Sequence, residues 1–112
     1  MTDCIFCQII KKEIPAQIIY EDEKIIAFKD IQPKAQTHLL LMPKQHFSSL
    51  AEASQPEILG QLLWQTKELA HKLGLAKNGY KIIINTGKEA GQAVFHLHLH
   101  LLSGDDLKEF NI

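Results

Sequence analysis

Three histidines alternate with leucines near the end of the chain, in the run FHLHLHLL over residues 95–102. In an extended strand this alternation places three imidazoles on one face and three leucines on the other. Leucines suit a core, whereas imidazoles act as nucleophiles, proton carriers or metal ligands. A solvated face that uses histidine by chance is the alternative, but lysine, threonine or glutamate would serve there equally well and do not recur.

The spacing of these histidines limits what they can do together. At ~3.3 Å per residue, neighbouring histidines lie about 6.6 Å apart and the outer pair about 13 Å apart. A zinc–nitrogen bond is only about 2 Å long, so one metal ion cannot bind all three without breaking the strand. The pattern therefore predicts divided roles, in which some imidazoles bind metal and others bind or attack a substrate.

The segment before the histidines carries two glycines, Gly87 and Gly91, and two side-chain amides, Asn85 and Gln92. Glycine allows a ligand to approach the backbone closely, and free N–H groups of a loop can hold phosphate oxygens. An ordinary hairpin loop would have a similar composition. The Walker A pattern G-x-x-x-x-G-K-[ST] is absent, so this is not a P-loop.

The two cysteines, Cys4 and Cys7, are spaced C-x-x-C. In a reducing compartment this spacing indicates a metal or redox site more than a structural disulfide. A redox pair would stand between a strand and a helix, and no strand is predicted before Cys4. The spacing therefore favours metal over redox chemistry.

The helices and strands that must position these residues can be predicted from the hydrophobic period and from the prolines and glycines that interrupt it. We expect a short helix over 4–12, strands over 18–20, 24–29 and 37–42, a long helix over 55–73, and strands over 80–85 and 94–102. Ser54 is the predicted N-cap of the long helix, with Glu57 at the capping-box position and Gly74 as its C-terminal cap. The run Leu39–Met42 predicts a strand buried on both faces.

With one long helix as a crossover, a doubly wound parallel sheet is excluded, and an antiparallel α+β fold is predicted. The 112 residues, 46% hydrophobic and 22% charged, fit one globular domain over 1–112. All 12 basic residues are lysines and the net charge is −1, which disfavours a nucleic acid polymer as partner. We expect no membrane span and no signal peptide, and thus a cytoplasmic protein.

The run H-L-H-L-H-L-L resembles the signature of the histidine triad (HIT) family, His-x-His-x-His followed by apolar residues. Further segments look like its Hint branch, the nucleoside phosphoramidases: residues 5–6, 13–15, 27–31, 37–38, 43–44 and 91–94. The resemblance implies a five-stranded antiparallel sheet with one long and one short N-terminal helix. It also implies a homodimer, in which two sheets join edge to edge into ten strands and the long helices pack across the axis.

By position, the resemblance implies that His98 attacks the α-phosphorus of a purine nucleotide of the AMP or GMP type, giving a nucleotidyl-histidine that water hydrolyses. His96 and His100 complete the triad. His100 and Gln92 would hydrogen-bond phosphate oxygens or the leaving group, with Asn85 nearby, and Asp30 would bind the ribose. The residues implied around the base are Ile5, Phe6, Phe28, Ile31, Leu40 and Val94. Ala93 stands where many relatives carry serine, so a hydroxyl donor near the leaving group is lost.

The resemblance also implies a zinc site, because Cys4, Cys7, His46 and His96 match four ligand positions of some HIT proteins. Such a Cys₂His₂ set is closed and structural. His38 is expected either to assist at the active site or to be a satisfied core histidine. Two alternative functions stay open: a dinucleoside polyphosphate hydrolase, and a non-catalytic zinc-bound nucleotide-binding protein. The tail over 103–112 diverges, so the leaving group is not predicted.

Overall fold

The computed structural model describes residues 3–105 and 107. Its main elements are α1 (Ile5–Ile10), β1 (Ile18–Glu21), β2 (Ile25–Lys29), β3 (Thr37–Pro43), α2 (Pro56–Lys72), β4 (Lys81–Ile83) and β5 (Leu99–Ser103). Three short 3₁₀ helices, Leu50–Glu52, Leu75–Lys77 and Lys88–Ala90, lie in the connections. Five strands form one sheet in the order β1-β2-β3-β5-β4, and all four neighbouring pairs are antiparallel.

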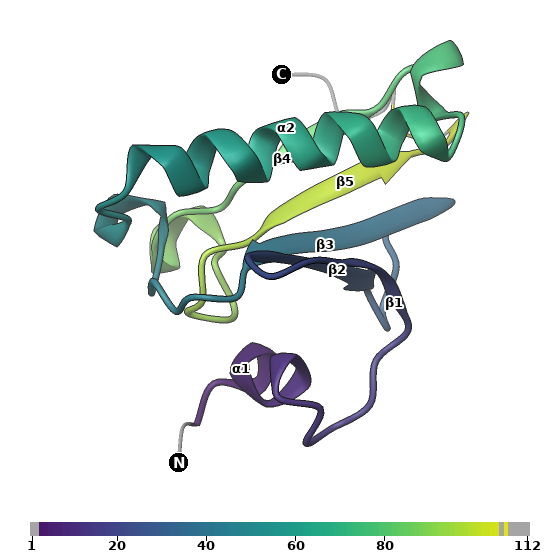
Figure 1. Cartoon of the computed structure of the whole chain (residues 1–112). Helices are drawn as coiled ribbons and strands as arrows, with labels where there is room; N and C mark the ends of the chain where they lie inside the picture. Colours follow the sequence, from purple (N-terminus) through teal and green to yellow (C-terminus); the bar gives the residue numbers. More distant parts are fainter. Residues whose placement is uncertain (1–2, 106, 108–112) are drawn as a thin grey trace.

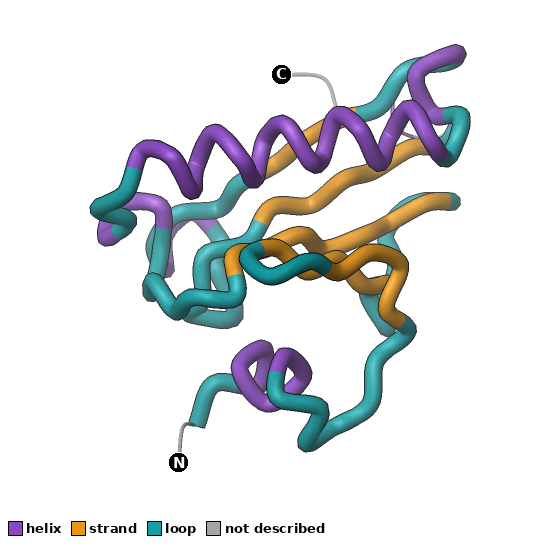
Figure 2. Tube along the Cα trace, viewed as in Figure 1, coloured by secondary structure: helices purple, strands orange, loops and turns teal. Residues whose placement is uncertain are grey.

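The two helices lie on opposite faces of this sheet. Figure 1 shows α2 along one face and α1 against the other, and Figure 2 shows the same arrangement by element type. The predicted α+β fold, with a five-stranded antiparallel sheet and one long and one short helix, is confirmed. Within residues 3–105 and 107, no helix is both long and apolar enough to cross a membrane.

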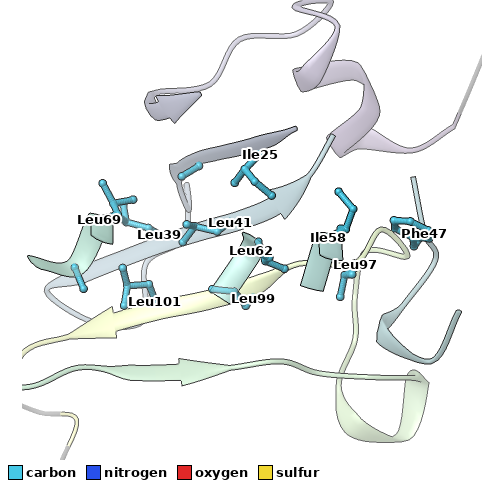
Figure 3. Close-up of a cluster of buried hydrophobic side chains, with 12 residues drawn as sticks. Ile25, Leu39, Leu41, Phe47, Ile58, Leu62, Leu69, Leu97, Leu99 and Leu101 are labelled. Atoms are coloured by element: carbon cyan, nitrogen blue, oxygen red, sulfur yellow. The ribbon is translucent and has the colours of Figure 1, made fainter. Parts of the chain in front are cut away.

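A strand with both faces buried separates two hydrophobic clusters. Leu39 and Leu41 of β3 point toward α2, whereas Leu40 and Met42 belong to the cluster on the α1 side. The leucines of the histidine run are part of the α2-side core, where Leu62 of α2 lies over them (Figure 3). That cluster contains Ile25, Ala27, Leu39, Leu41, Phe47, Ile58, Leu62, Leu69, Ala70, Leu97, Leu99 and Leu101. The α1-side cluster contains Phe6, Ile9, Ile26, Phe28, Leu40 and Met42.

The last strand is shorter than predicted. The predicted span is 94–102, but β5 begins at Leu99, so the first two histidines of the run precede the strand. The β3–β5 register, which pairs Leu41 with Leu99, would place Leu97 opposite Pro43. Proline has no N–H to donate to a ladder. The Leu97 N–H instead donates to the Phe47 carbonyl at 2.6 Å, which turns the chain away from the sheet.

Two details at other element ends also differ from prediction. The N-cap of α2 is Gln55 rather than Ser54, its side chain makes no capping hydrogen bond, and Pro56 is the first helical residue. Proline in the first turn costs no hydrogen bond, so the helix begins without the predicted capping box. β4 covers 81–83 rather than 80–85. The predicted end of α2 is confirmed, since Gly74 follows it with a left-handed φ of 78°.

Candidate active site and metal site

A cavity of about 540 Å³ lies on the α1 side of the sheet. It is lined by α1, the ends of β2 and β3, the segment before β5, and two histidines of the run. The sequence-predicted residues that the structure brings together in its lining are Ile5, Phe6, Phe28, Asp30, Ile31, Leu40, Asn85, Val94, His98 and His100. The lining therefore combines apolar side chains with imidazole, carboxylate and amide groups.

His98 is held in a single tautomer by its own backbone neighbourhood. Its Nδ1 lies 2.7 Å from the carbonyl oxygen of His96, which can only accept, so Nδ1 carries the hydrogen and donates it. The lone pair of Nε2 is then free. Burial lowers the pKa of His98 below its ordinary value, which keeps the ring neutral at pH 7. Phe6 packs edge-on against the ring, with ring centroids 5.0 Å apart.

A second chain of hydrogen bonds fixes the tautomers of His38 and His100. The Lys34 backbone N–H donates to His38 Nδ1 at 3.0 Å, so the hydrogen of a neutral His38 is on Nε2. That Nε2–H donates to His100 Nδ1 at 2.8 Å, which leaves the hydrogen of His100 on its own Nε2. Burial and the neighbouring imidazoles lower the pKa of His100 to about 4, so it too is neutral at pH 7.

The two imidazoles that line the cavity side by side therefore offer opposite groups. The rings of His98 and His100 have centroids 5.1 Å apart. One ring presents an unprotonated nitrogen and the other an N–H donor, although both are neutral. This pair can attack an electrophilic atom and hydrogen-bond an oxygen or nitrogen attached to it.

Polar groups beside the imidazoles come from loops of the chain. The Asp30 carboxylate accepts the Gln32 backbone N–H at 2.9 Å, and its other oxygen lies 3.4 Å from His38 Nε2. Asn85 donates from Nδ2 to the Ala90 carbonyl at 2.8 Å and so ties the 3₁₀ turn over 88–90 to the cavity wall. Gly91 completes the turn with φ of 87°, a conformation that favours glycine.

A second cluster joins the two cysteines to two histidines. Cys4 Sγ and Cys7 Sγ each lie 3.5 Å from His96 Nδ1, and Cys7 Sγ lies 3.3 Å from His46 Nδ1. The two histidine Nδ1 atoms are 3.1 Å apart. The four ligand atoms lie within 4.8 Å of one another, an arrangement that can hold a metal ion.

The tautomer of His96 suits a metal ligand. Its Nε2 donates to the Pro43 carbonyl at 2.8 Å, so the neutral ring turns an unprotonated Nδ1 toward the sulfur atoms. An outer hydrogen bond of this kind is typical of metal-bound histidine. Asp30, His38 and His100 also converge, but there His38 carries its hydrogen on Nε2, the atom a metal would need. The donor set therefore favours the cysteine cluster as the metal site.

Two predicted site residues lie away from the cavity. His96 is fully buried at 0% exposure and turns to the cysteine cluster, so it cannot reach a molecule in the cavity directly. Gln92, at 5% exposure, uses its amide for three hydrogen bonds to backbone groups and does not line the cavity. Their catalytic roles remain predictions, and the geometry gives both residues supporting contacts instead.

The HIT domain model matches residues 11–107 of the chain. The chain is a member of the HIT family. A relative from Zea mays, the "14 kDa zinc-binding protein", is 49% identical over 104 residues, covering 89% of this chain and 80% of that one. The HIT family hydrolase from Clostridium thermocellum superposes with a TM-score of 0.90 at 46% identity, covering 96% and 95% of the two chains. The histidine triad nucleotide-binding protein from Candida albicans gives a TM-score of 0.86 at 39% identity, covering 93% and 77%.

This HIT protein has cavity residues that the sequence did not single out. They are Ile9, Ile14, Pro15, Ala16, Lys29, Gln32 and Lys34. The helical period of α1 offered a signal for one of them, since Ile9 is one turn beyond Ile5 and shares its face. Lys29 and Lys34 bring positive charge to the cavity of a chain without arginine. His38 is buried and hydrogen-bonded, as a satisfied core histidine is, and it also lines the cavity, while its assistance in the reaction stays a prediction.

Proposed function

We propose that this HIT protein is a nucleotide hydrolase or transferase that cleaves a phosphoramidate bond at the α-phosphate of a purine nucleotide. The observation that carries the proposal is the fixed pair of neutral imidazoles, with His98 Nε2 unprotonated and His100 Nε2 protonated beside it. The names of its relatives, which include a hydrolase and a nucleotide-binding protein, support the same chemistry.

In the proposed reaction, His98 Nε2 attacks the α-phosphorus and forms a phosphorus–nitrogen bond. The bond to the leaving amine breaks as that nitrogen takes up a proton from solvent water. Positive charge grows on the His98 ring, and the His96 carbonyl that accepts from Nδ1–H stabilises it. The Nε2–H of His100 is placed to donate to a phosphate oxygen or to the leaving nitrogen. Water then attacks phosphorus and gives up a proton to solvent, and the bond to His98 breaks, which releases the nucleoside monophosphate and the neutral ring.

The rest of the cavity fits the other parts of a nucleotide. A planar base suits the apolar wall, where Phe6 and Phe28 pack edge to face with centroids 5.6 Å apart. The Asp30 carboxylate, oriented by the Gln32 N–H, is available to accept from ribose hydroxyls. Lys29 and Lys34 stand at the same cavity and offset phosphate charge. Ile31 is 91% exposed but lines the cavity, so a bound nucleoside would cover it.

We propose that the metal cluster of Cys4, Cys7, His46 and His96 binds zinc in a structural role. Tetrahedral zinc with bonds of about 2.3 Å to sulfur and about 2.0 Å to nitrogen needs sulfur–nitrogen separations of about 3.5 Å. Nitrogen–nitrogen separations of about 3.3 Å follow from the same bonds. The observed values of 3.3–3.5 Å and 3.1 Å are close to these. Four protein ligands leave no open position, and the zinc-binding name of the maize relative adds support.

The decisive experiment replaces the proposed nucleophile. His98→Ala should abolish turnover of adenosine phosphoramidate, while AMP binding and the circular dichroism spectrum are retained. The wild-type protein, quenched during turnover, should carry a nucleotidyl group on His98 that mass spectrometry locates. Full activity of the variant would refute the proposal. A wild-type protein that binds AMP but forms no adduct and turns over no substrate would favour the non-catalytic alternative.

Substrate preference separates the remaining enzyme alternative. A comparison of diadenosine tetraphosphate with adenosine phosphoramidate should give the higher kcat/KM for the phosphoramidate, and the reverse order would favour the dinucleoside polyphosphate hydrolase. Both reactions use the same nucleophile, so only the leaving group differs. Asp106 and residues 108–112, part of the divergent tail, lie outside the described residues.

We also propose the homodimer that the sequence predicted. β4 is an edge strand of the sheet, and an edge strand can pair with a second copy. Leu63 and Trp64 on α2 are exposed, at 54% and 61%, and offer an apolar surface. Sedimentation at micromolar concentration should give a dimer, and a stable monomer would exclude it. The expected cytoplasmic location is tested by fractionation of cells.

A further inference from the structure

Gln92 stands between two residues that line the cavity and points the other way. Gly91 and Ala93 belong to the cavity wall, whereas the Gln92 side chain is buried at 5% exposure outside it. Its Oε1 accepts the Gly87 N–H at 2.8 Å. Its Nε2 donates to the Ser48 carbonyl at 2.7 Å and to the Val94 carbonyl at 3.1 Å. The amide thus uses its acceptor once and both of its donor hydrogens.

These three partners are backbone groups of loops that no sheet ladder holds. Gly87 precedes the 3₁₀ turn over 88–90, and Gln92 also donates its own backbone N–H to the Gly87 carbonyl at 3.1 Å. Gly87 and Gln92 therefore exchange two hydrogen bonds, as a pair of residues does in an antiparallel ladder. The bond to Ser48 fastens this turn to the segment that follows His46. On this side of the cavity, the Gln92 side chain therefore links the loops that no backbone strand pairing connects.

We propose that Gln92 is a positioning residue, which holds the backbone of residues 91–93 against the cavity and does not touch the substrate. The proposal rests on the proposed function, because the backbone it holds is the wall beside His98. It replaces the expected hydrogen bond from the Gln92 side chain to phosphate. The N–H of Ala93 donates to no acceptor among the described residues, and the position of this N–H is what the amide controls.

The proposal makes a chemical demand that only a neutral amide meets. A carboxylate at position 92 keeps the acceptor for the Gly87 N–H but loses both donors, and it sets negative oxygens against two carbonyl oxygens. Protonation of that carboxylate restores one donor. Methionine, which has a similar shape, loses all three bonds at every pH. Gln92→Glu and Gln92→Met therefore separate the effect of losing the acceptor from the effect of losing the donors. Gln61→Glu, at an exposed position of α2, is the control for the added negative charge.

The first readout is hydrogen exchange of the Gly87 amide in nucleotide-free protein, measured by NMR. Gln92→Met should accelerate this exchange about tenfold or more, the effect expected when a buried donor loses its acceptor. Gln92→Glu and Gln61→Glu should leave it close to wild type. If Gln92 instead served only to bind phosphate, no variant would change the exchange of Gly87. Unchanged exchange in Gln92→Met, with weakened AMP binding, would overturn the proposal.

The second readout is kcat/KM for adenosine phosphoramidate between pH 5 and 8, expressed as the ratio of wild type to variant so that titration of the imidazoles cancels. The ratio for Gln92→Glu should grow about tenfold or more as the carboxylate ionises, and the ratio for Gln92→Met should stay constant. Equal and flat ratios would overturn the proposal, since a general loss of stability gives that result. If the wild-type protein turns over no phosphoramidate, the proposed function fails, and Gly87 exchange with AMP affinity still tests Gln92.

Discussion

Acidification should destabilise this protein partly through one ring, His100. Its pKa in the folded protein is lowered from 6.5 to about 4 by burial and by its neighbours His98 and His38. The unfolded chain therefore binds this proton first, so stability contributed by the neutral ring is present above pH 6.5 and is lost as the pH falls toward 4. At about 1.36 kcal/mol per pKa unit, the whole difference corresponds to about 3 kcal/mol.

Between pH 7 and pH 4.5 the same two pKa values give a loss of about 2 kcal/mol. The His100 ring is only partly buried, so solvent screening reduces the expected loss to about 1 kcal/mol. His100→Asn is the matched variant, because its side-chain oxygen can still accept from His38 Nε2–H but does not titrate. We expect urea unfolding, followed by circular dichroism, to show that wild type loses about 1 kcal/mol more than the variant between these pH values.

The difference between the two proteins is the measured quantity, since both carry the same proposed metal site and the release of a bound ion in acid cancels. Equal losses of stability in wild type and His100→Asn would refute the reasoning. They would mean that the folded protein binds a proton on His100 as readily as the unfolded chain does, and that the chain from the Lys34 amide through His38 does not hold the ring neutral.

Two further predictions concern the wall that α1 forms. Removal of the proposed metal by a chelator, or replacement of Cys4 and Cys7 by serine, should weaken AMP binding measured by calorimetry. The proposed metal site would join α1, which carries Phe6, to the segments that carry His46 and His96. AMP affinity unaffected by metal removal would exclude this coupling. Phe6→Ala should lower the free energy of unfolding in urea by about 3 kcal/mol, since the ring packs on Phe28 and His98; a loss below about 1 kcal/mol would show that α1 is not firmly packed.

Much of the fold could be predicted from hydrophobic period alone. The apolar run over 39–42 predicts burial on both faces, and its residues do divide between the two clusters. The alternation of leucine and histidine places the leucines in the core beneath α2, as their period of two requires. These predictions succeed because the burial of apolar side chains is the dominant driving force of folding, and it produces a regular hydrophobic period in the sequence.

The ends of elements were less predictable, because they depend on partners far away in the chain. Nothing in the run over 95–102 indicates that strand pairing begins only at Leu99. The cause lies elsewhere in the chain, in Pro43 across the ladder and in the Phe47 carbonyl beyond it. Ser54 and Glu57 fit a capping box, yet Pro56 begins the helix. The fixed φ of proline suits the first helical position, so the residue before it, Gln55, becomes the N-cap.

Some features of the candidate site likewise follow from the spacing of the histidines, and others depend on tertiary contacts. Spacing dictates that three alternating imidazoles cannot share one metal, and the structure sends His96 to the cysteines while His98 and His100 line the cavity. The chemical identity of each ring nitrogen, however, is set by the Pro43 carbonyl, the His96 carbonyl and the Lys34 N–H. Each is a backbone carbonyl or N–H, which every residue type carries except that proline lacks the N–H. A sequence can therefore name the imidazoles that perform the chemistry, but which of them attacks and which donates follows from the backbone that surrounds them.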